Sequence, residues 1–292
     1  MKVSHGLPAV ALAASLVAAG CGDVNGALAR LAAARQAAAD LQLAFTRAVD
    51  ASNRAVMAET DAESVRDAQD AIAARQAAHR DIDALRPLLD QLGYTDEKRM
   101  LDQFAGRFAA YETLDGQILD LAVENTNLKA QRLSFDAGEA AAGAFRDAVQ
   151  ALTAAQTRDA WRVRATAATA LAAIREIQVL QGPHIAAAED ASMTRFETSM
   201  QAEETMARGA LGDLAPLVDA ASRPKLTAAA NALDRFVSVN AQIITLSRRN
   251  TNVRSLALSL NQKQQLIPPC DQSLRELRDA LAHRGYPKGR WE

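Results

Sequence analysis

The chain has 292 residues, a formal net charge of -2, 23% charged residues and only 4% aromatic residues. Its many alanines, with 14 Gly and 8 Pro, favour long helices over sheets. The near-neutral charge and the lack of a long basic run exclude a phosphate-binding face, so we expect no nucleic acid partner. The length suits two domains of ordinary size.

The N-terminus has the pattern of a secretory signal. Met1-Lys2 precede an apolar run over residues 7–19, which is too short to span a bilayer because a spanning helix needs about 20 residues. Residues 18–21, Ala-Ala-Gly-Cys, resemble a lipoprotein signal, which implies a signal peptide at 1–20 and acylation of Cys21. Ordinary cleavage after residues 27–29, Ala-Leu-Ala, is the alternative and would remove this cysteine.

An acyl anchor would be the only membrane attachment, because no later stretch is apolar for long enough to cross a membrane. We therefore expect a periplasm-facing lipoprotein of the cell envelope, with the inner or outer membrane left open. The other cysteine, Cys270, lies on an apolar helical stripe with Leu274 and Leu277, which predicts a buried thiol. With Cys21 acylated, no intramolecular disulfide would form.

From about Gly26 onward, apolar residues recur at helical spacing and predict an all-α protein. Between residues 143 and 182 there is neither Gly nor Pro, so one helix on the order of 55 Å long is expected there. Asp96 and Ser222 are predicted N-caps. Tight turns are predicted at residues 60–63, 93–96, 189–192 and 222–224.

The sequence repeats itself, since residues 108–136 align without gaps on residues 233–261. The identities include Asn-Thr-Asn at 125–127 and at 250–252. Flanking matches, such as residues 85–88 with 214–217, extend the repeat in both directions. We therefore predict two tandem antiparallel helical bundles forming an elongated rod, at residues 21–152 and 153–284, followed by a flexible tail at 285–292.

Each copy is expected to contain three helices and a shorter fourth. The third helix is long and carries the Asn-Thr-Asn segment. The fourth begins near Gly138 in copy one and at Pro268 in copy two, since Pro suits a first helical turn. A three-helix unit, in which the last two helices are continuous, is the alternative.

No catalytic constellation is present in the sequence, which predicts a protein that is not an enzyme and holds no cofactor or metal. The histidines after the signal, His79, His184 and His283, lack the Glu-x-x-His spacing of di-metal bundles. The few glycines form no phosphate-cradling loop. A haem held by one His and one Met stays open as an alternative.

The paired Asn-Thr-Asn segments are the most informative feature. Asn125 and Asn250 fall in apolar seams, and burying an amide without partners costs about 1–3 kcal/mol. One interpretation is a polar pair that fixes helix register. The other is a site for a small polar ligand between helices. Its candidate residues are Asn125, Thr126, Asn250, Thr251, Arg248, Arg249 and Arg254.

The run from residue 242 to 260, Gln-Ile-Ile-Thr-Leu-Ser-Arg-Arg-Asn-Thr-Asn-Val-Arg-Ser-Leu-Ala-Leu-Ser-Leu, resembles the four-helix-bundle ligand-sensing domain of methyl-accepting chemotaxis proteins. The resemblance covers copy two well and copy one more faintly. It implies an extracytoplasmic bundle that binds a small molecule or a partner, often at a dimer interface, so a homodimer is one expected assembly. The chain lacks a second span and a kinase-coupling region, so only the sensing module carries over.

The leading hypothesis is a non-catalytic, lipid-anchored periplasmic module that binds a small polar ligand or a partner such as an envelope sensor protein. A helical envelope-stress or metal-handling protein is the rival, with Met193, Met200 and Met206 as its local methionine cluster. A structural spacer is the third alternative.

Overall fold

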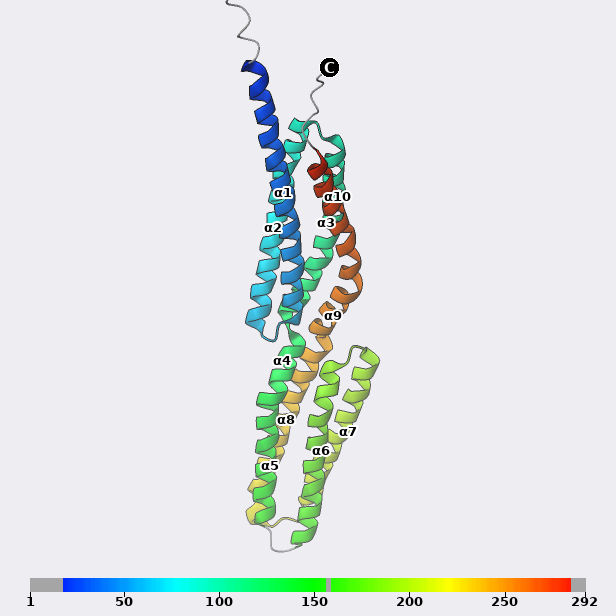
Figure 1. Ribbon diagram of the computed structural model, residues 1–292. Coiled ribbons are helices and arrows are strands. Elements are labelled where there is room, and N and C mark those ends of the chain that lie inside the picture. Colours follow the sequence, from blue (N-terminus) through cyan, green and yellow to red (C-terminus); the bar gives the residue numbers. More distant parts are fainter. Residues whose placement is uncertain (1–17, 156–158, 285–292) are drawn as a thin grey trace, which may run out of the picture. The chain divides into compact units, whose positions relative to one another are not determined.

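The computed structural model in Figure 1 describes residues 18–155 and 159–284, with side chains from Asn25 onward. Within these ranges the protein is all-α and contains no strand, which confirms the predicted fold class. Most of the predicted signal peptide and the predicted tail at 285–292 lie outside the described residues. Cys21 falls within the backbone of the first helix, but its side chain lies outside the described part.

The helices follow one another with short connections. Two of the short segments, η1 and η3, are π-helical turns, and η2 is a 3₁₀ turn. In chain order the elements are α1 (Ala18–Met57), α2 (Asp61–Leu92), α3 (Thr95–Glu124), α4 (Thr126–Leu133), η1 (Ser134–Gly138), α5 (Glu139–Ala154), α6 (Ala160–Ala186), α7 (Asp190–Leu214), η2 (Ala220–Ser222), α8 (Arg223–Arg249), α9 (Thr251–Leu258), η3 (Ser259–Lys263) and α10 (Gln264–His283).

The predicted turns fall at helix boundaries, but the long helix predicted over residues 143–182 was wrong. It is interrupted between Ala154 and Ala160, where Asp159 takes a left-handed conformation with φ 50°. Asp96 lies in the first turn of α3 instead of capping it. Ser222 does stand at the N-cap of α8, but its side chain makes no capping hydrogen bond.

The described chain divides into two compact units that differ from the two sequence copies. Unit 1 takes residues up to 54, 66–116 and from 259 onward, so it is built from α1, α2, most of α3, and α10. Unit 2 takes residues 55–65 and 117–258, and its bundle is built from α5, α6, α7 and α8. The predicted division at 152/153 is therefore not the division into compact units.

Each unit contains three helices from one sequence copy and the fourth helix from the other, and Figure 1 shows α10 beside α1 and α3. A single residue, Asn125 or Asn250, separates the third helix from the helical run that follows. An antiparallel helical hairpin needs a loop of about 2–5 residues, so a one-residue connection cannot fold the fourth helix back onto the third. The fourth helix of each copy consequently completes the other bundle.

The fourth helix also begins elsewhere than predicted. In copy two the helical run resumes at Thr251, passes through η3 and enters α10, so Pro268 and Pro269 lie inside α10 instead of at its start. In copy one it resumes at Thr126, well before Gly138. The break in each third helix therefore lies at the Asn-Thr-Asn segment itself.

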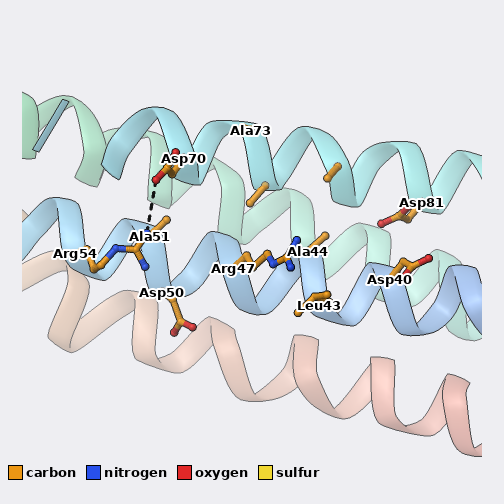
Figure 2. Close-up of a pocket in the computed structure, with 12 residues that line it drawn as sticks. Asp40, Leu43, Ala44, Arg47, Asp50, Ala51, Arg54, Asp70, Ala73 and Asp81 are labelled. Carbon is orange, nitrogen blue, oxygen red and sulfur yellow. Dashed lines mark ion pairs between the residues drawn. The ribbon is translucent and has the colours of Figure 1, made fainter. Parts of the chain in front are cut away.

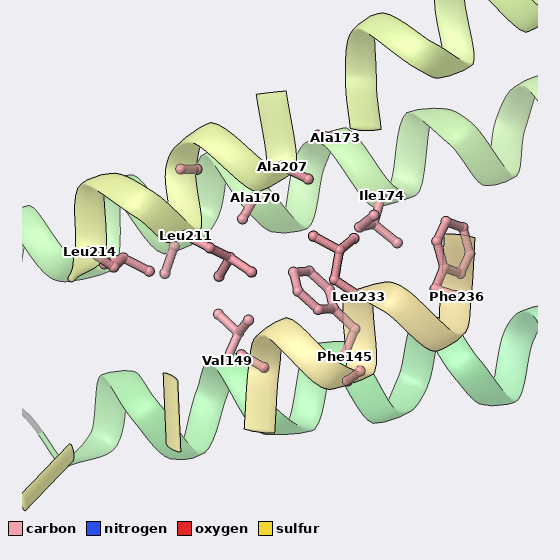
Figure 3. Packing of buried hydrophobic residues seen from close by; sticks show 14 of the residues in the cluster. Phe145, Val149, Ala170, Ala173, Ile174, Ala207, Leu211, Leu214, Leu233 and Phe236 are labelled. Carbon is pink, nitrogen blue, oxygen red and sulfur yellow. The ribbon is translucent and has the colours of Figure 1, made fainter. Parts of the chain in front are cut away.

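The core of unit 2 combines two phenylalanines with smaller aliphatic residues. Phe145 of α5 and Phe236 of α8 lie in one buried cluster with Ile174 of α6 and Leu211 of α7 (Figure 3). The alanines of α6, such as Ala170 and Ala173, are buried in the same cluster. Since alanine is small, it allows the neighbouring helices to approach closely.

Aromatic rings fill the core of unit 1. Phe45 of α1 makes edge contacts with Phe104, Phe108 and Tyr111 of α3, with ring centroids 5.3–6.0 Å apart. Cys270 of α10 is fully buried in this core, as predicted, and burial raises the pKa of its thiol to about 11. A thiol that is buried and protonated is inert.

Within the described residues, no helix combines the length and the apolar character needed to cross a membrane.

Candidate functional site

The two Asn-Thr-Asn segments start at matching left-handed residues in unit 2. Asn125 has φ 51° and ψ 39°, and Asn250 has φ 53° and ψ 38°. Asparagine tolerates this conformation better than most residues with a side chain, because its short polar group can hydrogen-bond locally. Each Asn therefore ends one helix and lets another start at the next residue.

The first turns of α4 and α9 cap each other reciprocally. The Thr126 backbone N–H donates to Thr251 Oγ1 at 3.1 Å, and the Thr251 N–H donates to Thr126 Oγ1 at 3.2 Å. One residue further on, the N–H of Asn127 donates to Asn252 Oδ1 at 3.1 Å, and that of Asn252 donates to Asn127 Oδ1 at 3.2 Å. N–H groups that a helix start leaves without partners are thus satisfied by the other segment.

The amide groups extend this pairing. Asn127 Nδ2 donates to Asn250 Oδ1, and Asn252 Nδ2 donates to Asn125 Oδ1, both at 2.8 Å. Asn127 and Asn250 also donate to the carbonyls of Ile185 and Ala187 at the end of α6, at 2.7 and 3.0 Å. By contrast, Asn125 Nδ2 is buried without a hydrogen-bond partner.

The structure thus brings Asn125, Thr126, Asn250 and Thr251 together, with exposures of 6% or less, in one network that uses most of their hydrogen-bonding capacity. A ligand would have to displace these bonds or use the single open donor of Asn125. The geometry therefore favours the register-fixing interpretation over the ligand site.

The predicted arginines do not converge on the paired segments. Arg248 forms a two-pronged contact with Glu197 of α7, with nitrogen to oxygen distances of 2.6 and 2.8 Å. This hydrogen bonding is the main reason that the pKa of Glu197 is lowered. Arg249 contacts Glu124, and Arg254 is exposed on α9.

His184 is buried beside the same carboxylate, with Nε2 at 2.8 Å from Glu197 Oε1 and Nδ1 lacking a partner. Its backbone carbonyl accepts a hydrogen bond from Ser247 at 3.1 Å. These contacts link α6, α7 and α8, so His184 holds helices together in unit 2.

Unit 1 contains a buried cluster of charged side chains around Asp115 of α3. Asp115 of α3 is fully buried, and its Oδ1 accepts a hydrogen bond of 2.5 Å from Ser52. Lys263 is also fully buried; its Nζ donates to Ser52 Oγ at 2.8 Å and lies 3.8 Å from Asp115 Oδ1. Arg75 donates to Asp115 Oδ2 at 3.2 Å.

Burial dominates the electrostatics of this cluster. It lowers the pKa of Lys263, while the nearby Asp115 raises it. Burial, followed by the negative charge of Asp115, raises the pKa of Tyr111, a residue that stands one helical turn before Asp115 on α3. With Lys263 protonated, one carboxylate faces two cations. The side chains of Asp115, Lys263 and Ser52 are closed off from solvent, and that of Arg75 is 14% exposed.

Sequence reasoning missed this cluster because it placed the seam of the third helix about one residue away. The predicted seam ran through Leu114, Ile118, Leu121 and Leu128, but only Ile118 of these is fully buried, and the three leucines are half-buried. The fully buried row instead runs through Tyr111, Asp115, Ile118 and Ala122. The four-residue spacing from Tyr111 to Asp115 was the available signal.

Unit 2 has an uncharged counterpart. Asn240, which aligns with Asp115, accepts from Gln181 Nε2 at 2.9 Å. Gln181 Oε1 in turn accepts from Ser134 at 2.6 Å, and Asn240 Nδ2 lies 3.7 Å from the sulfur of Met200. The same seam position is therefore charged in one bundle and neutral in the other.

A surface groove runs between α1 and α2 in unit 1, with a volume of about 560 Å³. Figure 2 shows Arg47 near its middle, Asp40 and Asp81 towards one end, and the Arg54–Asp70 ion pair towards the other. Small side chains form the floor of the groove: Ala44, Ala51, Ala73, Ala74 and Ala77.

The charges of the groove are incompletely paired. Asp81 has a raised pKa because it is partly buried and because the Asp40 carboxylate is close. Arg47 and Asp50 take part in none of the hydrogen bonds or ion pairs found among the described side chains. The groove thus offers one cation and several carboxylates to a molecule from outside.

No group of three or more His, Cys, Asp or Glu side chains in the described residues has the arrangement needed to hold a metal ion. Of the methionines considered for metal handling, Met193 and Met200 are buried in unit 2, whereas Met206 is 48% exposed. The three therefore do not form one exposed thioether cluster.

The described residues thus form an all-α protein built from helical bundles. No protein-family model matches the sequence, and no curated protein matches it significantly.

Proposed function

We propose that this chain is a non-catalytic, lipid-anchored binding module of the cell envelope, and that it binds its ligand or partner in the α1–α2 groove of unit 1. The observation that carries the proposal is the groove itself, because it joins an alanine floor to charged groups that lack partners. The resemblance of residues 242–260 to chemotaxis sensing domains supports a binding role. The N-terminal pattern at Cys21 supports the anchor.

The charges of the groove define the kind of ligand. A cationic group would neutralise the repulsion between Asp40 and Asp81, and an anionic group would pair with Arg47. A small zwitterion, or a peptide segment with both charges, satisfies these two requirements together. The amide network of unit 2 has fewer free groups to offer, so we place binding in the groove instead of at Asn125 and Asn250.

A thermal-shift screen tests the binding proposal. The panel contains amino acids, organic acids, short peptides and divalent metals. We expect at least one zwitterion to stabilise the wild type and to lose that effect in Arg47→Ala and Asp81→Asn. Arg99→Ala is the matched control, since this arginine is exposed on α3 and lies outside the groove. A ligand shift that is equal in all variants would move the site elsewhere, and no shift with any compound would favour the spacer alternative.

The anchor has a separate test. Expression of the full sequence in a Gram-negative host should place the protein in the membrane fraction, and Cys21→Ser should release it. N-terminal sequencing of the mature protein would contradict acylation if it began at Arg30, the residue after the alternative cleavage site.

A further inference from the structure

Each of the two π turns exposes a large apolar side chain at a place where the helical period predicts burial. Phe135 of η1 stands three residues before Gly138 and seven before Ala142, which are both buried, so it continues their row at helical spacing. Phe135 is nevertheless 72% exposed. Leu260 holds the matching place in η3 and is 60% exposed.

The π turn itself explains this exposure. A π turn holds more residues than an α-helical turn, because its hydrogen bonds run from residue i to residue i+5. The wider turn lets Ser134 face the interior instead of Phe135, and the Ser134 hydroxyl donates to Gln181 Oε1 at 2.6 Å. Ser259 is the buried counterpart in η3. Such turns occur frequently at functional sites, and this one moves an aromatic ring to the surface of unit 2.

The exposed Phe135 lies at a groove between α5 and α6. Together with Val179 of α6, which is 53% exposed, it lines a hollow of about 220 Å³. A second hollow of about 240 Å³ adjoins the first, since both are lined by Glu139, Arg175 and Gln178. Apolar side chains also line the second hollow: Ala142, Phe145, Leu171 and Ile174. The groove therefore offers apolar surface to a ligand in both of its parts.

The charges that remain free in this groove are positive. Arg175 takes part in no hydrogen bond or ion pair with any other described residue. Arg146 has only a contact of 3.8 Å with its exposed neighbour Asp147, and such surface pairs contribute little. Glu139 is the one carboxylate among the described residues of the lining, and it accepts a hydrogen bond from Gln178 at 2.7 Å. An anion would thus face two available guanidinium groups.

We propose that the α5–α6 groove of unit 2 binds an amphipathic anion, a carboxylate with an apolar tail of the fatty-acid class. The carboxylate pairs with Arg146 and Arg175 in the second hollow, because arginine suits two-pronged recognition of carboxylates. The tail covers Phe135 and Val179 in the first hollow and removes their apolar surface from water. The α1–α2 groove suits a different ligand, since its several carboxylates would repel an anion that carries no positive group.

Isothermal titration calorimetry tests the site in the full chain with Cys21→Ser, a substitution that prevents acylation. Decanoate below its micelle concentration is the probe. Decyltrimethylammonium carries the same tail with a cationic head, and acetate carries the anionic head without the tail. We expect decanoate to bind and the other two compounds not to bind. Binding of decyltrimethylammonium as tight as that of decanoate would overturn the proposal, and so would no binding of any compound.

Substitutions of exposed residues locate the site. Phe135→Ala and Arg175→Ala should each weaken decanoate binding about tenfold, because one removes the contact with the tail and the other a contact with the head. Leu260→Ala and Arg164→Ala are the matched controls and should leave the affinity unchanged. Leu260 has the place of Phe135 in η3, and Arg164 is exposed on α6 outside the groove.

A further variant separates this site from the α1–α2 groove. Arg47→Ala removes the cation of that groove and should leave decanoate binding unchanged. Binding that is lost in Arg47→Ala but kept in Arg175→Ala would overturn the proposal, as would equal weakening by Phe135→Ala and Leu260→Ala.

Discussion

The two bundles share a helical framework but fill the centre of the third-helix seam differently. Unit 1 places Asp115 there with Lys263 and Arg75, whereas unit 2 places Asn240 with Gln181. Buried charges carry a large desolvation penalty, and a neutral amide pair avoids most of it. The comparison shows that this seam position accepts either a charged Asp or a neutral Asn. In each unit, the side chains around it match its charge.

The largest expected effect comes from removing the charge at the centre of unit 1. Asp115→Asn leaves the buried Lys263 and the half-buried Arg75 without a carboxylate, and breaking a buried ion pair in this way costs about 3–5 kcal/mol. Asn240→Ala in unit 2 should cost less, about 1–3 kcal/mol, because only neutral groups lose partners.

Hydrogen exchange read out by mass spectrometry suits this comparison, because two compact units need not unfold in a single step. Protection should fall in α1–α3 for Asp115→Asn and in α6–α8 for Asn240→Ala. Equal losses from the two substitutions would contradict the distinction between a charged and a neutral centre.

The next comparison is between the two left-handed asparagines. Asn250 makes two side-chain hydrogen bonds, with Asn127 and the Ala187 carbonyl, whereas Asn125 makes one, with Asn252. Glycine keeps the left-handed conformation, so each Gly variant loses only side-chain bonds, at about 0.5–1.5 kcal/mol per bond. We expect Asn250→Gly to destabilise unit 2 more than Asn125→Gly.

Alanine separates the backbone contribution from the amide contribution. Replacing either Asn by Ala should cost about 1–2 kcal/mol more than replacing it by Gly, because Ala is strained at positive φ. Chemical denaturation monitored in unit 2 measures both differences. An Asn125→Gly variant less stable than Asn250→Gly would show that the unpaired Asn125 amide has an important partner, such as a ligand.

The smallest effects concern acid stability, where each unit has a carboxylate held by an arginine. Hydrogen bonds from Arg284 lower the pKa of Glu97 in unit 1, and those from Arg248 lower the pKa of Glu197 in unit 2. A lowered folded-state pKa stabilises the folded protein above the ordinary carboxyl pKa, near 4.5, and this contribution is lost as the pH falls through the lowered value.

Glu97→Gln and Glu197→Gln should therefore each flatten the decline of unfolding free energy below pH 4.5, in their own unit. The change should be larger for Glu97, whose side chain is 3% exposed against 26% for Glu197. Melting curves recorded between pH 3 and pH 7 measure this change. If a variant loses as much stability in acid as the wild type, the ion pair of that glutamate is not a source of the acid sensitivity.

Much of the fold was predictable because it follows from local signals. Composition and helical periodicity gave the all-α class, Gly93 marked a turn with φ 70°, and the stripe through Cys270 was buried as expected. These features depend on residues close together in the chain.

The exchange of fourth helices was not predictable, since both copies carry the same apolar period and either bundle offers a suitable surface. The sequence reads Asn125 as an interior helical residue, and only its backbone angles reveal a break. From the sequence, Lys263 is expected at the surface, because lysine is rarely buried unless it has a partner. Its partner in the structure, Ser52, lies far away in the chain and could not be identified from the sequence.

Truncation after Leu258 tests the exchange of fourth helices most directly, because it removes η3 and α10 and leaves every other helix in place. We predict that hydrogen-exchange protection is lost in α1, α2 and α3 of unit 1, whereas α5, α6, α7 and α8 keep theirs. Loss of protection in α6–α8 with α1–α3 intact would contradict it and restore the tandem division at residue 152.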